Sequence, residues 1–69
     1  MTYREIIRNL RIKYKISQNE LGKALKVTRN YINMVENNTG NTSLSVEQAE
    51  RIINMIYKMG EEKKKENNK

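Results

Sequence analysis

The stretch SQNELGKALKVTRNYINMVEN, residues 17–37, decides the fold of this chain. Ser17 and Glu20 have the spacing of a capping box, in which a hydroxyl and a carboxylate satisfy unpaired amides at a helix start. Val27 and Thr28 interrupt the helix that follows, and Thr28 is a favourable N-cap for a second helix over about residues 29–36. Two short helices joined by a turn of about three to four residues predict a helix-turn-helix.

One more helix is predicted on each side of this pair. The first, over about residues 2–14, begins with a Thr-x-x-Glu capping box. The last, over about residues 45–59, begins with Ser-x-x-Gln and is expected to stop at Gly60. Between the helix at about 29–36 and the last helix, residues 37–43 have the Asn, Gly and Ser/Thr content of a loop.

Apolar residues recur at steps of three and four in each predicted helix, and no strand-like alternation persists. The positions expected to be buried are Tyr3, Ile6, Ile7, Leu10, Tyr14, Leu21, Ala24, Leu25, Val27, Ile32, Val35, Val46, Ala49, Ile52, Ile53, Ile56 and Met59. The fold class is therefore predicted to be all-α, a compact four- to five-helix bundle over residues 1–60. Residues 61–69, EEKKKENNK, contain no apolar side chain and are expected to form a polar, disordered tail.

The composition argues against catalysis, metal binding and a membrane span. The chain has no His, Cys or Asp, so a Ser-His or Cys-His pair cannot be built and a metal site would need Glu alone. No apolar run approaches the length of a membrane span. We expect a cytoplasmic, soluble protein that is not an enzyme and has no catalytic residue, metal, cofactor or small-molecule ligand.

The positive charge is concentrated in the N-terminal half. Residues 1–30 contain eight basic and two acidic side chains, a balance of +6, whereas residues 31–60 contain two basic and three acidic ones, a balance of −1. A basic surface attracts polyanions, because neutralised phosphates release their condensed counterions. The charge distribution thus favours a nucleic-acid partner.

The sequence resembles the phage repressor and Cro class of regulators, also called the xenobiotic-response-element (XRE) family. The resemblance covers roughly residues 4–59 and rests on LR at 10–11, SQxEL at 17–21, KVT at 26–28, YI at 31–32, VEN at 35–37 and SL at 43–44. It implies a transcriptional repressor, of phage or mobile-element type, that binds a double-stranded operator as a symmetric homodimer. The second helix of the motif would enter the major groove.

The resemblance also implies which residues contact DNA. Base contacts are expected from Arg29, Asn30, Asn33 and Met34, and phosphate contacts from Gln18, Asn19, Lys23, Tyr31, Asn37 and Lys13. Arg29 is the first choice, because its guanidinium pairs bidentately with guanine and a cation is unfavourable at a helix start unless it is used. The alternative role of Asn33 and Asn37 is to terminate the helix. The alternative role of Tyr31 is packing of its ring.

Three further expectations concern structure. Arg11 and Glu36 match a structural ion pair of the family, which would link the first helix to the end of the third. Lys26 stands where the family commonly has glycine, so it is expected to adopt left-handed backbone at a cost of about 1 kcal/mol. Gly22 replaces the usual alanine, which permits close approach but weakens its helix by about 0.5 to 1 kcal/mol.

The last helix and the tail bear on partners other than DNA. Met55, Ile56, Tyr57 and Met59 surround much of the last helix and are expected to form the dimer interface. The alternative function is an antitoxin-like or other protein-interaction module of the same fold that autoregulates its own operon, although the polar tail offers little apolar surface for a toxin. An RNA or single-strand binder is disfavoured, because only four Tyr are present to stack on bases.

Overall fold

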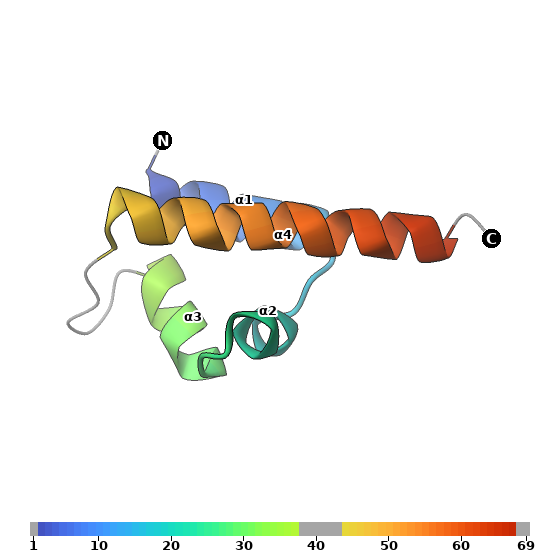
Figure 1. The fold of residues 1–69 in the computed structure, drawn as a ribbon. Coiled ribbons are helices and arrows are strands. Elements are labelled where there is room, and N and C mark those ends of the chain that lie inside the picture. The colour runs from blue at the N-terminus through green and yellow to red at the C-terminus, as the bar shows by residue number, and fades with distance from the viewer. Residues whose placement is uncertain (1, 38–43, 68–69) are drawn as a thin grey trace.

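Four helices make up the described part of the chain, which is residues 2–37 and 44–67 of a computed structural model. They are α1 (Tyr3–Lys13), α2 (Gln18–Leu25), α3 (Arg29–Asn37) and α4 (Val46–Asn67). Figure 1 shows α1 and α4 lying side by side, with α2 and α3 beneath them. These two ranges contain no strand, so the predicted all-α bundle is confirmed. Most of the predicted loop, residues 38–43, lies outside the described residues, as do residues 68 and 69.

Each helix begins where its capping pattern predicts. The Ser17 hydroxyl accepts from the Glu20 amide at 3.0 Å, and the Glu20 carboxylate accepts from the Ser17 amide at 3.2 Å. Ser45 and Gln48 make the same reciprocal pair before α4. Such caps satisfy amides that have no carbonyl partner within the helix, so they fix where each helix starts.

Both α1 and α2 end in a Schellman motif that has lysine in the left-handed position. After α1, Lys15 has φ 57°, and the Ile16 amide donates to Arg11 O at 3.0 Å. After α2, Lys26 has φ 61°, and the Val27 amide donates to Gly22 O at 2.8 Å. The left-handed backbone expected of Lys26 is confirmed, whereas that of Lys15 was not predicted. Each lysine occupies a conformation that glycine adopts without steric cost.

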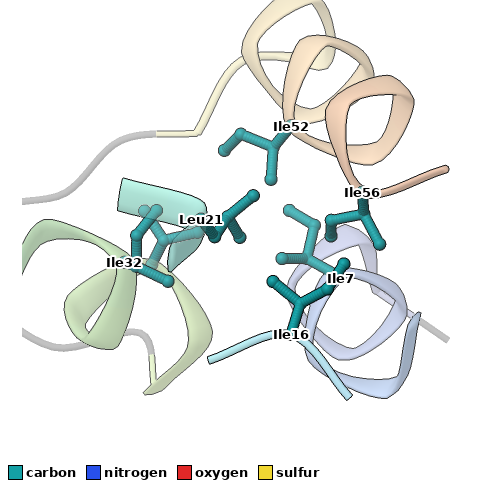
Figure 2. Packing of buried hydrophobic residues seen from close by; sticks show 7 residues of the cluster. Ile7, Ile16, Leu21, Ile32, Ile52 and Ile56 are labelled. Atoms are coloured by element: carbon teal, nitrogen blue, oxygen red, sulfur yellow. The ribbon is translucent and has the colours of Figure 1, made fainter. Parts of the chain in front are cut away.

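The core lies where all four helices meet. Figure 2 shows Ile7, Ile16, Leu21, Ile32, Ile52 and Ile56 converging there, and each is at most 4% exposed. Ile16 was not predicted, because it stands between helices, at the Schellman position whose side chain commonly packs back on the preceding helix. The buried positions predicted at Tyr3, Val27 and Val46 are wrong, since all three are exposed. They stand at helix starts or in the turn, where neighbouring helices no longer cover them.

Gly60 does not end the last helix, which is a correction to the sequence analysis. α4 continues through it to Asn67, so residues 61–67 of the expected disordered tail are helical. A Cβ atom at Gly60 would lie 2.6 Å from Cδ1 of Tyr14, well inside contact distance. The glycine is therefore explained by packing, because it gives the Tyr14 ring room to lie on α4.

The described helices include none with the length and apolar character that crossing a membrane requires. Within the same residues, no group of three or more acidic, His or Cys side chains is placed to hold a metal ion.

Candidate nucleic-acid interface

The turn between α2 and α3 is tight because it packs directly on Gly22. A Cβ atom added there would lie 2.9 Å from Val27 O and 3.3 Å from the Arg29 amide nitrogen. Thr28 then caps α3, accepting from the Tyr31 amide at 3.0 Å. The predicted close approach at Gly22 is confirmed by these distances. Together they fix the direction in which α3 leaves the turn.

Three of the four side chains predicted to read bases are exposed on α3. Arg29, Asn30 and Asn33 are exposed, whereas Met34 is half-buried and its Sδ accepts from Asn30 Nδ2 at 3.6 Å. One shallow hollow is lined by Gln18, Thr28, Arg29, Asn30 and Asn33, and a second by Arg11, Ser17, Gln18, Asn19 and Arg29. Because Gln18 and Arg29 line both hollows, the starts of α2 and α3 form one continuous polar surface. We call this the reading surface, made of Gln18, Asn19, Arg29, Asn30 and Asn33.

Amide side chains on the reading surface and beside it are hydrogen-bonded to one another. Gln18 Nε2 donates to Asn33 Oδ1 and to Glu36 Oε1, each at 3.4 Å. Asn37 Nδ2 donates to Asn33 Oδ1 at 2.7 Å and to Asn33 O at 3.0 Å. The amide hydrogens of Asn37 are therefore directed back into its own helix, which is the helix-terminating alternative for this residue.

The ion pair between Arg11 and Glu36 holds α1 to the end of α3. Arg11 Nε lies 2.6 Å from Glu36 Oε2 and Arg11 Nη2 lies 3.0 Å from Glu36 Oε1, a bidentate arrangement. Arg11 Nη1 also donates to Ile16 O at 2.9 Å. The Glu36 side chain is only 2% exposed. The predicted pair is thus confirmed, and through Glu36 Oε1 it reaches Gln18 on the reading surface.

Arranged in this way, α2, its turn and α3 have the geometry of a helix-turn-helix. The helix-turn-helix family model HTH_3 matches residues 7–55, well over half of the chain. The chain belongs to the Cro-type (XRE) helix-turn-helix family. It is therefore a DNA-binding transcription regulator, and its family is typically non-enzymatic. No curated protein and no solved structure matches it.

Three of the phosphate contacts implied by the Cro-type resemblance lie away from the reading surface. Tyr31 is half-buried and lines a separate hollow together with Leu25 and Ile52, which is the packing alternative for this residue. Lys13 is the last residue of α1, and its ammonium lies 5.7 Å from the centre of the Tyr14 ring. Lys23 is exposed on α2 but lines neither hollow of the reading surface.

Two basic residues that the sequence analysis did not assign support the Cro-type motif from outside it. Arg4 Nη1 donates to Val35 O at 2.8 Å, which ties α1 to the last turn of α3. Lys63 Nζ donates to Lys15 O at 2.7 Å and lies 3.1 Å from Glu20 Oε2, which ties α4 to the start of α2. A cation close in sequence to a helix end often donates to the last carbonyls of that helix. Here Arg4 and Lys63 donate to carbonyls that are 31 and 48 residues away in sequence, so local spacing does not reveal these contacts.

Among the described residues, Glu20 is the one whose pKa clearly departs from its ordinary value. Its pKa is lowered, first by the hydrogen bond from the Ser17 amide and then by the hydrogen bond and charge of Lys63. Both partners favour the ionised form of the carboxylate. Glu20 therefore keeps its negative charge while the capping box holds α2 in place.

The four residues expected to form the dimer interface do not share one face of α4. Ile56 is fully buried in the core, so its assignment to an interface is wrong. Met55 and Met59 are half-buried against that core, and Tyr57 packs edge-to-face on Tyr14 with ring centres 5.9 Å apart. Residues two apart on a helix point about 200° apart, so Met55 and Tyr57 face nearly opposite ways.

Proposed function

We propose that this regulator is a sequence-specific repressor that binds a palindromic operator as a homodimer, with α3 in the major groove. One observation carries the proposal: Arg29, Asn30 and Asn33 stand exposed together at the start of α3, beside Gln18 at the start of α2. A helix-turn-helix reads base edges with the N-terminal residues of its second helix. Occupying a promoter is sufficient for repression, whereas activation needs a further contact with the polymerase.

Each exposed side chain is given a role by its chemistry. Arg29 pairs bidentately with a guanine, and Asn30 pairs with an adenine through its amide. Met34, beside Asn30, supplies an apolar contact such as a thymine methyl group. Lys23 and Lys13 neutralise phosphates and Asn19 donates a hydrogen bond to one, with further contacts from Gln18, Tyr31 and Asn37 where the backbone of the duplex approaches them.

The homodimer is proposed to use the outer side of α4. A shallow hollow there is lined by Glu47, Glu50, Arg51, Asn54, Met55 and Lys58. A two-fold axis places identical surfaces against each other, so antiparallel α4 helices would set the Glu47 end of one copy against the Lys58 end of the other. Sedimentation should show a dimer on operator DNA, and Lys58→Glu should weaken it while Glu47→Lys in the same chain restores it. A wild-type protein that stays monomeric on DNA contradicts this interface.

The test of the function compares wild type with Arg29→Ala on two duplexes. One carries the region upstream of the protein's own gene and the other is random, and binding is followed by mobility shift across a salt series. Arg29→Ala should weaken the specific complex by about 1 to 3 kcal/mol and relax discrimination at one base pair of each half-site. Arg8→Ala removes the same charge from an exposed position on α1 and should lower both affinities alike.

A symmetric footprint lost with Arg29 supports a sequence-specific regulator. Equal affinity for both duplexes, falling steeply with salt, leaves only the electrostatic contribution and contradicts the proposal. A stoichiometric protein that co-purifies with the chain would then favour the antitoxin-like alternative.

A further inference from the structure

The amide of Asn33 has its oxygen occupied from within the protein. Oδ1 accepts from Gln18 Nε2 at 3.4 Å and from Asn37 Nδ2 at 2.7 Å. An amide oxygen has two lone pairs and therefore two acceptor positions. Both positions of Asn33 Oδ1 are filled without DNA, which leaves the Nδ2 amino group as the part of this side chain that a base can meet.

Neighbouring contacts hold this orientation. The Gln18 amino group also donates to Glu36 Oε1, and the Glu36 carboxylate is itself held by Nε and Nη2 of Arg11. Asn37 donates to Asn33 O at 3.0 Å as well as to Oδ1. Rotating the Asn33 amide by half a turn would place its amino group against two other amino groups. Donor-to-donor contact is unfavourable, so the network selects one orientation.

This orientation removes one of the usual roles of asparagine at a DNA-reading position. Pairing with adenine is bidentate: the side-chain oxygen accepts from N6 while the amino group donates to N7. Asn33 has no acceptor to offer N6. Asn30 differs, because its amino group donates to the weak acceptor Met34 Sδ at 3.6 Å and its Oδ1 accepts nothing among the described contacts.

We infer that Asn33 reads its base pair as a donor and selects guanine, whereas Asn30 next to it selects adenine. Guanine presents two acceptors in the major groove, N7 and O6, whereas thymine presents one, O4, beside a methyl group. Cytosine presents the N4 amino donor, and adenine places a donor beside N7. The half-site thus contains a second guanine besides the one paired with Arg29. This inference rests on the proposed function, because it concerns the same surface.

Asn33→Asp provides an isosteric test. The aspartate keeps an oxygen for Gln18 and Asn37 but replaces the outward amino group with an oxygen, which inverts what the base meets. Wild type, Asn33→Asp and Asn33→Ala are each used to enrich binding sites from a randomised duplex pool. Anisotropy titrations then measure each protein on the enriched site with all four base pairs at the Asn33-dependent position. Helical content by circular dichroism verifies folding.

Wild type should enrich guanine at one position that Asn33→Ala no longer discriminates. Asn33→Asp should change that preference to cytosine and bind the guanine duplex at least about 10-fold more weakly than wild type does. Asn30→Asp is the matched control, since it should alter a different position and leave this guanine in place. Asn33→Ala removes an exposed side chain and its two surface hydrogen bonds but buries no charge. It therefore still tests the inference if the aspartate variant fails to fold.

Two failures are distinguishable. A wild-type pool in which no sequence is enriched overturns sequence-specific binding and the inference with it. Three results overturn the inference alone: an Asn33-dependent pair that is A·T or T·A, a G·C pair whose orientation Asn33→Asp does not reverse, or a site that Asn33→Ala leaves unchanged.

Discussion

Replacing Arg11 with methionine should remove a large part of the stability of this domain. Methionine retains much of the aliphatic volume but leaves the Glu36 carboxylate, 2% exposed, with Gln18 as its remaining donor. Removing one partner of a buried pair costs about 3 to 5 kcal/mol, because the other charge stays buried without compensation. A chain of 69 residues has a total stability of only about 3 to 10 kcal/mol. The variant is therefore expected to lose between about a third and all of the wild-type free energy of unfolding.

Urea denaturation followed by circular dichroism measures this loss, and two further variants separate its causes. Arg8→Met makes the same replacement at an exposed site of α1 and should change the free energy of unfolding by less than about 0.5 kcal/mol. Arg11→Met combined with Glu36→Met removes both charges and should recover most of the loss, because no buried charge remains. A single Arg11→Met variant that loses less than about 1 kcal/mol would refute the argument from burial.

Two other predictions concern the ends of α2. In urea titrations Lys26→Gly should raise the free energy of unfolding by about 0.5 to 1 kcal/mol, because glycine adopts the φ of 61° without steric cost. Lys23→Gly, inside α2, should lower the free energy of unfolding by a similar amount. Equal effects of the two substitutions would contradict the conformational explanation. NMR titration should give Glu20 a pKa below 4.5, and Lys63→Met should raise it only partly, since the Ser17 amide is the larger cause. Because the pKa of Glu20 is lower in the folded than in the unfolded state, its ionised carboxylate stabilises the fold above the unfolded pKa. This stabilisation is lost as the pH falls through the folded pKa. A Glu20 pKa at or above 4.5 would contradict the capping geometry.

Local patterns carried most of the fold prediction. Helix starts at Ser17, Thr28 and Ser45 depend on side chains within three residues, so the sequence contains the whole interaction. Periodic apolar residues likewise indicated which face of each helix is buried, and Ile7, Leu21 and Ile32 are buried as expected. The family resemblance added the Arg11–Glu36 pair, which local spacing alone does not indicate.

Features that depend on distant neighbours were not predictable in this way. Glycine near the end of a helical pattern usually signals a stop, and only the Tyr14 ring, 46 positions earlier in the chain, explains why Gly60 is helical instead. Ile56 has the same apolar chemistry whether it faces the core or a second copy, so its burial follows from how α4 packs. The amide orientation at Asn33 requires Gln18 and Asn37 in three dimensions.

The continuation of α4 past Gly60 has a consequence for protein engineering. Figure 1 shows the C-terminal end of α4 projecting away from α3, beyond the rest of the bundle. A reporter or effector domain fused there through a short helical linker would be carried away from α3, in the direction of the α4 axis. Ending α4 before Lys63 to make the fusion smaller would instead remove the hydrogen bond from Lys63 to Lys15 O and the ion pair with Glu20. The junction for such a chimaera therefore belongs after Lys63.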